Sequence, residues 1–484
     1  MSDLLKDGLA RNFVAGQWRE GDGGACLAVE DPATEETVAD CALAGEASLG
    51  AALEAARASA DRGDLADMLP RDRATLLRRI AGEIRALKPD GAALLCRESG
   101  KRLCDATDEF EEAAQYFEYY GGVADKIEGK SIPLGPHYAD FTISEPVGVS
   151  AQIVPWNFPV SLAARSLAPA LAAGNAVIIK SPELDPLGLS LLGRAIERAD
   201  VPAGAVSILN GIGADLGARL VASPQIDQIV FTGSVATGQS ILAAAARNVT
   251  PALMELGGKS AAVAFDDADL DQLMDSLQTG IFFNAGQVCS AMSRLLVQRG
   301  LYDRAVAAAK VRAETLVAGH GRDNADLTPL ISAGQLARVE HLTSMARQAG
   351  ARVVTGGQRL ERRGHFMAAT ILADVDPGSA IAQQEIFGPV ICMTPFDTEA
   401  EAIAMANGTE FGLVAGVFTQ DISRAIRVAR KLRGGQVFVN EWFAGGIATP
   451  FGGVGKSGFG REKGLEAMTN YLRTKNIAIK ISGA

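Results

Sequence analysis

Residues 149–180, VSAQIVPWNFPVSLAARSLAPALAAGNAVIIK, contain two short β-branched runs that flank a helix rich in Ala and Leu. Apolar runs that alternate with helices are typical of strands buried in a parallel α/β sheet. Similar runs follow at 205–209 and 228–231. The second half of the chain repeats the pattern and predicts a second α/β domain, with strand-like runs at 261–265, 294–297, 390–392 and 436–439.

Amphipathic segments flank this region. Apolar residues recur at three- and four-residue steps over 47–95 and again over 105–120, before the glycine pair at 121–122, which predicts helices. Residues 140–145 and 475–481 instead alternate apolar and polar residues, as half-exposed strands do. Because an exposed apolar edge strand tends to pair with another chain, we expect the tail to lie at a subunit contact.

Composition excludes several classes of protein. The chain has 484 residues, enough for about three folded units. Its net charge of -11 argues against a nucleic-acid partner. Six cysteines without a CxxC pair and four histidines without metal-ligand spacing exclude a disulfide scaffold and a zinc site, so no metal is expected.

The sequence predicts no membrane association and a cytoplasmic location. Residues 1–7 lack the basic and apolar regions of a secretory signal. The apolar stretch 162–179 is interrupted by Arg165, Pro169 and Gly174, so it is unsuited to cross a bilayer. Cysteines without a disulfide pattern agree with a reducing compartment.

A glycine-containing turn at 228–238, QIVFTGSVATG, joins a predicted strand to a predicted helix. Gly233 and Gly238 bracket Ser234, so backbone N–H groups and a hydroxyl would converge at a helix N-terminus, which can bind an anion. A tight turn without a ligand is the alternative. The GxGxxG fingerprint of the common dinucleotide fold is absent.

Three other stretches contain reactive residue types. Cys289 follows a glycine-containing turn in 282–290, and its thiolate would be a strong nucleophile if activated, although a buried inert thiol is the alternative. Glu255 lies in apolar surroundings, which raise a carboxyl pKa towards that of a general base; a surface acid at a strand end is the alternative. Asn157 lies between two prolines, where its amide could stabilise an oxyanion or merely belong to a turn.

Taken in this order and spacing, the stretches resemble the NAD(P)-dependent aldehyde dehydrogenase superfamily of the hydrolytic, non-acylating type. The resemblance covers nearly the whole chain and includes six motifs, at 154–159, 167–175, 253–259, 282–290, 384–390 and 450–462. It implies an α/β fold with two Rossmann-like parallel-sheet domains and a small β oligomerisation arm. It also implies oxidation of a small-molecule aldehyde to the carboxylic acid.

The resemblance implies a role for each matched residue. Cys289 would attack the aldehyde to give a thiohemiacetal and later a thioester, and Asn157, with the backbone N–H of Cys289, would hold the oxyanion. Glu255, 34 residues before Cys289, would activate the hydrolytic water. Lys180 and Glu183 match contacts to the adenosine ribose.

The remaining cofactor contacts are also implied by the resemblance. They comprise the pyrophosphate turn at Gly233, Ser234 and Gly238, the nicotinamide-side residues Glu385 and Phe387, and Ile153, Pro155, Trp156, Thr232 and Leu256. A carboxylate at Glu183 accepts hydrogen bonds from a ribose 2′-hydroxyl but repels a 2′-phosphate, so NAD is preferred. Lys180 nearby offsets part of that repulsion, so NADP is not excluded.

The implied substrate pocket contains Phe158, Leu162, Arg165, Phe283, Val288, Ser290, Phe443, Gly445 and Phe451. Arg165 resembles the arginine with which succinate-semialdehyde dehydrogenases help to bind the substrate carboxylate. Phe283, however, stands where those enzymes place a second arginine, and a helix-surface arginine is the alternative. Ser166 stands where many relatives carry a lysine that assists the proton path. Semialdehydes, amino-aldehydes and aromatic aldehydes all remain candidate substrates.

Three other functions compete with hydrolytic aldehyde oxidation. A relative that passes the acyl group to coenzyme A typically lacks the base at Glu255. A catalytically silent structural relative would not need Cys289, Glu255 and Asn157 together. A cysteine hydrolase without a cofactor would not explain the cofactor residues.

The resemblance also predicts the domain layout. We expect an NAD(P)-binding domain over 1–125 and 147–257, a catalytic domain over 258–467, and an oligomerisation arm over 126–146 and 468–484. The arm implies a homodimer or a homotetramer.

Overall fold

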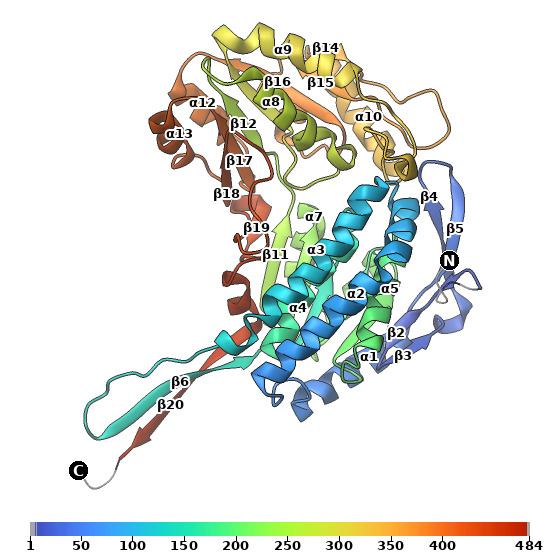
Figure 1. Cartoon of the computed structure of the whole chain (residues 1–484), viewed down its shortest axis with the longest axis vertical. Coiled ribbons are helices and arrows are strands. Elements are labelled where there is room, and N and C mark those ends of the chain that lie inside the picture. The colour runs from blue at the N-terminus through green and yellow to red at the C-terminus, as the bar shows by residue number, and fades with distance from the viewer. Residues whose placement is uncertain (1–4, 6, 482–484) are drawn as a thin grey trace.

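The computed structural model describes residues 5 and 7–481. Two large sheets with helices on their faces form most of the molecule, and a two-stranded antiparallel sheet projects from it (Figure 1). Predominantly parallel strands in both sheets confirm the predicted α/β fold.

The first large sheet has the strand order β19-β11-β10-β7-β8-β9-β2-β3. The five strands from β11 to β9 are parallel, whereas β2, β3 and β19 join antiparallel at the two edges. Its strands are β2 Asn12–Val14, β3 Gln17–Arg19, β7 Val149–Ile153, β8 Ala176–Ser181, β9 Val206–Asn210, β10 Gln228–Gly233, β11 Ala252–Leu256 and β19 Gly458–Phe459.

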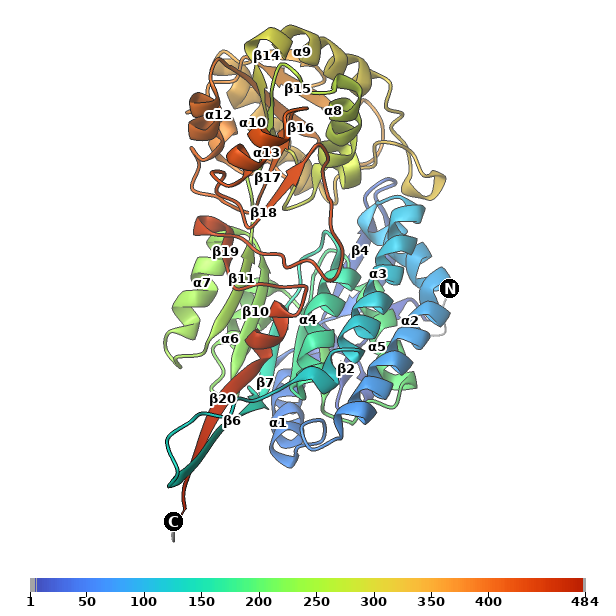
Figure 2. The same cartoon turned by 60° about the vertical axis from the view of Figure 1, so that its left-hand side comes forward.

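Helices cover both faces of this sheet. One face carries α2 Pro70–Ser99, α3 Leu103–Gly121, α4 Pro159–Ala173 and α5 Leu187–Arg198; the other carries α1 Glu46–Arg62, α6 Ala218–Val221 and α7 Val235–Ala245 (Figures 1 and 2). Strand β8 shows why both faces need covering. Val177 and Ile179 pack in the α2–α5 core, while Ile178 between them packs in the α1 core, because successive strand side chains point to opposite faces.

The second large sheet has the order β14-β15-β16-β13-β12-β17-β18 and is parallel except for β14. Its strands are β12 Ala261–Ala264, β13 Arg294–Gln298, β14 Arg352–Thr355, β15 Thr370–Ala373, β16 Val390–Phe396, β17 Val414–Phe418 and β18 Gln436–Val439. The helices in this half are α8 Leu270–Leu277, α9 Arg299–Glu314, α10 Ala333–Gln348, α11 Ala380–Gln383, α12 Glu399–Ala406 and α13 Ile422–Ala429.

Two smaller sheets complete the structure. Strands β1 Leu9–Ala10, β4 Cys26–Asp31 and β5 Glu36–Ala42 form the first of them. The second is the projecting two-stranded sheet of β6 Tyr138–Pro146 and β20 Leu472–Lys480 (Figure 2). These two strands pair antiparallel over their full length, from Leu472 opposite Pro146 to Lys480 opposite Tyr138.

The helical region predicted over 47–95 is interrupted. Helix α1 ends at Gly63, whose φ of +70° suits glycine and whose N–H bonds back to the carbonyl of Ala60. Helix α2 then begins at Pro70, a residue favoured in the first turn of a helix. Among the described residues, no helix is both long and apolar enough to cross a membrane.

Two glycines of α2 give a matched test of the α2–α3 packing. A Cβ at Gly91 would lie 2.3 Å from Cζ of the buried Phe110 on α3, whereas a Cβ at Gly82 would meet no atom within 4 Å. Gly82→Ala should therefore stabilise the fold by about 0.5–1 kcal/mol through helix propensity. Gly91→Ala should destabilise it by about 1–3 kcal/mol through overpacking. Urea denaturation of both variants measures the difference, and stabilisation by Gly91→Ala would contradict the described packing.

Candidate active site

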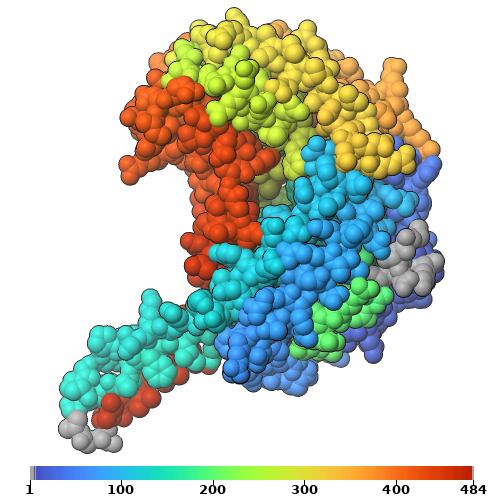
Figure 3. All heavy atoms as spheres, viewed as in Figure 1, coloured from blue at the N-terminus to red at the C-terminus, as the bar shows by residue number. Residues whose placement is uncertain are grey.

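Two cavities meet between the two large sheets. One has a volume of about 720 Å³ and the other about 520 Å³, and Asn157 and Cys289 are the described residues that line both. The smaller cavity opens between α3 and the segment around residue 443, where Figure 3 shows a hollow between the blue helices and the orange-red part of the chain. Any chemistry shared by the occupants of the two cavities must take place at these two residues.

Cys289 is placed by a backbone bend just before it. Asn284, Ala285 and Gly286 have φ values of +48°, +52° and +73°. A Cβ at Gly286 would lie 2.1 Å from the carbonyl oxygen of Gly388, so only glycine fits there. The bend delivers Cys289, which is half-buried, to the junction of the cavities.

Burial raises the pKa of the Cys289 thiol to about 11, and the charge of Arg165 offsets only part of the effect. At neutral pH the thiol is therefore protonated in this structure. A nucleophilic role requires that the proton leave as the sulfur attacks.

Glu255 lies at the end of β11, paired through β10 with the rest of the first sheet. Its side chain is buried, and neither carboxyl oxygen has a hydrogen-bond partner within the described part of the chain. Burial raises its pKa well above the usual value, the charge of Glu462 adds to the rise, and Arg165 and Arg461 oppose it. A surface acid is therefore ruled out, and a buried carboxyl with free lone pairs can act as a proton acceptor.

The loop after Glu255 packs against the backbone of Cys289. A Cβ at Gly258 would lie 2.6 Å from the carbonyl oxygen of Cys289. Glycine at this position therefore allows the first sheet to approach the nucleophile segment of the second sheet.

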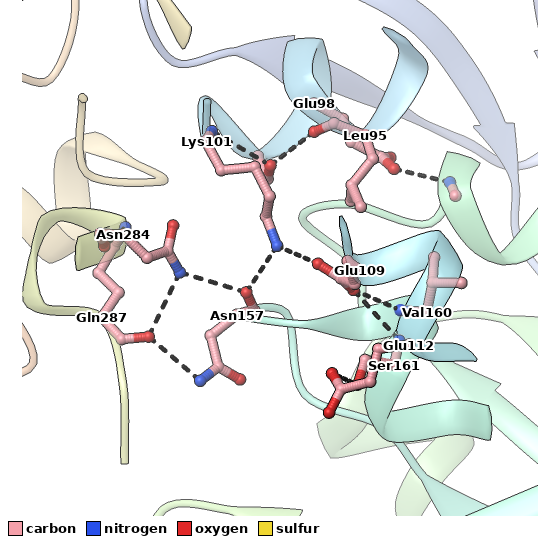
Figure 4. Close-up of polar contacts among 12 residues, drawn as sticks. Leu95, Glu98, Lys101, Glu109, Glu112, Asn157, Val160, Ser161, Asn284 and Gln287 are labelled. Atoms are coloured by element: carbon pink, nitrogen blue, oxygen red, sulfur yellow. Dashed lines mark hydrogen bonds and ion pairs between the residues drawn. The ribbon is translucent and has the colours of Figure 1, made fainter. Parts of the chain in front are cut away.

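Asn157 lies in the loop between β7 and α4 and is 5% exposed. Its Nδ2 donates to the carbonyl oxygen of Gln287 at 3.1 Å, which ties it to the segment that carries Cys289 (Figure 4). The amide has a second N–H, and the side chain lines both cavities. An amide N–H beside the thiol is suited to stabilise a negative oxygen formed there.

Arg165 is not a helix-surface arginine, because it is buried, lines the smaller cavity and has a charged partner. It is 6% exposed, and its guanidinium forms an ion pair with buried Glu462. Ser166 Oγ also donates to Glu462, at 2.9 Å, and the guanidinium lies 5.4 Å from the ring centroid of Phe451. Glu462 comes from a segment almost 300 residues away, and its charge offsets part of the charge that Arg165 presents to the cavity.

The smaller cavity has a largely aromatic wall. The rings of Phe158 and Phe283 stack at 5.8 Å, and Phe443 contacts Phe283 edge-on at 6.2 Å. All nine residues expected in the substrate pocket line this cavity: Phe158, Leu162, Arg165, Phe283, Val288, Ser290, Phe443, Gly445 and Phe451. Trp442, absent from that expectation, also lines it and donates from Nε1 to the carbonyl of Ser290 at 3.0 Å.

The larger cavity contains eight of the twelve residues expected at the cofactor. They are Pro155, Trp156, Thr232, Gly233, Ser234, Leu256, Glu385 and Phe387. Ile153, Lys180, Glu183 and Gly238 do not line it. Ile153 and Lys180 are register partners at the ends of β7 and β8, and Gly238 is buried in α7 against Leu256.

The residues of the larger cavity suit a dinucleotide. Ser234 caps the N-terminus of α7, where backbone N–H groups can meet a pyrophosphate. Half-buried Glu385 accepts the N–H of Gly258 at 3.1 Å, and desolvation of its carboxyl raises its pKa to about 7. A Cβ at Gly257 would lie 2.2 Å from Glu385 Oε2, so only glycine permits this close approach.

The Lys180–Glu183 pair lies at the carboxyl end of β8, an interior strand of the first large sheet. Lys180 Nζ pairs with Glu183, whose other oxygen accepts the N–H of Gly213 at 3.4 Å. Burial alone would raise the Glu183 pKa, but the charge and hydrogen bond of Lys180 hold it below its usual value. Glu183 is therefore an ionised acceptor, as a ribose hydroxyl would require.

Sequence reasoning missed four residues that organise the site. Asn284 and Gln287 contact Asn157, Lys101 donates to the Asn157 carbonyl, and Glu462 pairs with Arg165. Asn284, Gln287 and Glu462 lie within quoted motifs, which could have drawn attention to them. Lys101 has no local signal, because only tertiary packing brings it to the loop.

Comparisons with known proteins agree on one family. The sequence model described as the aldehyde dehydrogenase family matches residues 18–477. An aldehyde dehydrogenase of Emericella nidulans is 37% identical, covering 98% of this chain and 95% of its own. A betaine aldehyde dehydrogenase of Cereibacter sphaeroides is 39% identical, covering 97% of each chain. A solved NAD+ complex of an aldehyde dehydrogenase from Bacillus cereus superposes with a TM-score of 0.97 at 35% identity, covering 100% of this chain and 99% of that one.

The Arg165–Glu462 pair gives a stability prediction. Arg165→Met should destabilise the fold by about 3–5 kcal/mol, because Glu462 is left buried without its partner. Adding Glu462→Gln should recover much of the loss. Arg352→Met breaks a largely exposed pair with Asp374 at 2.7 Å and should cost at most about 1 kcal/mol. Equal shifts in urea midpoint for Arg165→Met and Arg352→Met would contradict the buried-pair description.

The raised pKa of Cys289 gives a pH prediction. Below its pKa, the thiolate fraction of a thiol rises about tenfold per pH unit. Alkylation of Cys289 by iodoacetamide in the cofactor-free protein should therefore still be accelerating between pH 7 and 9. Peptide mass spectrometry measures the rate at Cys289, with the exposed Cys26 as an internal comparison. A plateau below pH 8 would mean that a cation lowers the Cys289 pKa despite burial.

Proposed function

Because the chain belongs to the aldehyde dehydrogenase family and oxidises aldehydes to carboxylic acids, we propose that Cys289, Asn157 and Glu255 carry this reaction. The observation that most supports the assignment is that Cys289 and Asn157 line both cavities. An aldehyde in the smaller cavity and a dinucleotide in the larger one would meet at these two residues.

In the first step, Cys289 Sγ bonds to the aldehyde carbon, the thiol proton passes to solvent water, and the electron pair of the carbonyl π bond moves to the oxygen. The oxygen of the resulting thiohemiacetal is negative, and the second N–H of the Asn157 amide stabilises it. Nearby Arg165 favours the thiolate, as its effect on the Cys289 pKa indicates.

The residues of the larger cavity would hold the nicotinamide cofactor, which would supply the hydride acceptor that oxidation of the thiohemiacetal requires. The chain's own task is then hydrolysis of the thioester left on Cys289. Glu255, once ionised, takes a proton from a water molecule that attacks the thioester carbonyl. The carbon–sulfur bond then breaks, which releases the carboxylic acid and frees Cys289 Sγ for the next cycle. Burial makes the Glu255 carboxylate a stronger base than an exposed one, and its unpartnered oxygens leave it free to accept the proton.

We propose NAD+ as the preferred cofactor. Glu183 supports this preference, because an ionised carboxylate accepts hydrogen bonds from the ribose 2′-hydroxyl and repels a 2′-phosphate. Lys180 is already paired with Glu183, so its charge offers little compensation for a 2′-phosphate. Gly233 and Ser234 would hold the pyrophosphate, and Glu385 would lie beside the nicotinamide-side ribose.

We propose an aromatic or bulky apolar aldehyde as the substrate. The stacked wall of Phe158, Phe283 and Phe443 supports this class, because aromatic rings bind flat apolar groups well. Glu462 offsets part of the charge of Arg165, which makes that arginine a weaker anchor for the carboxylate of a small semialdehyde.

The projecting β6–β20 sheet supports a further proposal. We propose that residues 126–146 and 468–484 form an oligomerisation arm of a homodimer or homotetramer. Tyr138, Phe141 and Ile479 are apolar and exposed on it, as is typical of a surface covered by another subunit. We also propose a cytoplasmic location, because all six cysteines, which lie within the described residues, are free.

Glu255→Gln tests the assignment of the base. The variant should release a burst of NADH of about one equivalent and then slow at least about 100-fold, because the thioester forms but no base activates water. Stopped-flow absorbance with phenylacetaldehyde, betaine aldehyde and succinate semialdehyde measures burst and steady state, and ranks the substrates.

Two comparisons make this test decisive. Cys289→Ala should give no burst while it still binds NADH. Steady turnover by Glu255→Gln at the wild-type rate would contradict the role of the base, and coenzyme A-dependent turnover of the wild type would favour the acylating alternative.

A further inference from the structure

A buried ion pair between the α2–α3 loop and α3 contacts the backbone of the oxyanion donor. Lys101 and Glu109 side chains are 1% and 2% exposed and bind each other. Lys101 Nζ also donates to the carbonyl oxygen of Asn157 at 2.9 Å (Figure 4). We propose that this pair positions Asn157 for catalysis, an inference that rests on the proposed role of Asn157 in aldehyde oxidation.

Lys101 is turned inward by the end of α2. Gly100 ends the helix with a φ of +77°, and a Cβ there would lie 2.7 Å from both Pro32 and Pro329. The following loop is also tightly packed, because a Cβ at Gly321 would lie 2.0 Å from the carbonyl oxygen of Lys101. The ammonium is therefore held by a backbone that has little room to move.

The contact of Lys101 with the carbonyl of Asn157 restrains the side chains on both sides. That carbonyl belongs to the peptide plane between Asn157 and Phe158, so fixing it fixes ψ of the first residue and φ of the second. Lys101 Nζ also lies 4.5 Å from the ring centroid of Phe158, a cation–π contact. One ammonium group thus restrains both the oxyanion donor and an aromatic residue of the substrate cavity.

Glu109 fixes the other side of the same loop. Its Oε1 accepts the N–H groups of Val160 and Ser161, at 2.9 and 3.2 Å, in the first turn of α4. A carboxylate is favoured at this helix end, where N–H groups lack intrahelical partners. The five-residue segment from Asn157 to Ser161 is consequently held at its first carbonyl by Lys101 and at its last two N–H groups by Glu109.

The other contacts of Asn157 come from the nucleophile segment. Asn284 Nδ2 donates to the same carbonyl at 3.2 Å, and Asn157 Nδ2 donates to Gln287. Lys101 is the only charged donor to the Asn157 carbonyl among the described residues, and hydrogen bonds from charged donors are stronger than neutral ones. Its loss should leave Asn157 in place but less well oriented.

The test compares Lys101→Met with wild type. We expect the rate constant of the NADH burst, with the fastest aldehyde of the screen above, to fall by about 10- to 100-fold, since small misplacements of a catalytic group cost rates of that order. The dissociation constant for NADH, measured by fluorescence, should change less than about twofold, because Lys101 does not line the larger cavity.

A double-mutant cycle separates positioning from loss of structure. In an Asn157→Ala background, Lys101→Met should slow the burst by less than about threefold, because the group that it positions is already gone. Multiplicative losses in the double variant would overturn the proposal. A general weakening of the fold would lower the rate in both backgrounds.

Two further variants complete the design. Lys88→Met breaks an ion pair between α2 and α3, in which Lys88 Nζ lies 2.9 Å from Glu111. This variant should leave the burst unchanged, and a loss equal to that of Lys101→Met would overturn the proposal. Should Lys101→Met fail to fold, Lys101→Met/Glu109→Gln removes the unpaired charge and is expected to show the same slow burst. Equal bursts in wild type and the Lys101 variants would overturn the positioning role but not the proposed function, which fails instead if Cys289→Ala keeps its burst.

Discussion

The hydrogen bond from Asn157 Nδ2 to the carbonyl of Gln287 joins the two halves of the site. Asn157 follows a strand of the first large sheet, and Gln287 precedes a strand of the second, so the bond crosses between separately built layers. Both halves are rigid at this point, since Lys101 fixes one and the bend at Gly286 fixes the other. The two cavities meet at Cys289 and Asn157 because these loops are held together.

Burial sets the electrostatic state of this junction. The pKa values of Cys289, Glu255 and Glu385 are all raised chiefly by desolvation, so Cys289 and Glu255 hold their protons at neutral pH, whereas Glu385, with a pKa of about 7, is partly ionised. Arg165 opposes the rise at Cys289 and Glu255, while Glu462 neutralises much of the arginine's charge. The buried ion pair therefore brings little net charge to the site, and Cys289 and Glu255 become charged only as chemistry proceeds.

Much of the fold could be predicted from the sequence because buried parallel strands are short β-branched runs. The run at 176–180 corresponds to β8, and those at 294–297 and 436–439 correspond to β13 and β18. Strand β17, Val414–Phe418, was missed, because its Gly416 interrupts the apolar pattern; a Cβ there would lie 2.7 Å from the ring of Trp442. The break between α1 and α2 was missed because apolar periodicity continues on both sides of Gly63.

The sequence by itself determined the family, the parallel α/β class and the residue types at the reacting centre, because these reside in local motifs around Asn157, Glu255 and Cys289. Only the tertiary structure decided how those residues are surrounded. The sequence did not indicate that Glu462 pairs with Arg165, or that Lys101 contacts the site at all. Local sequence encodes secondary structure and residue chemistry, whereas burial, ion-pair partners and pKa shifts arise from segments that are distant in sequence and meet only in the folded chain.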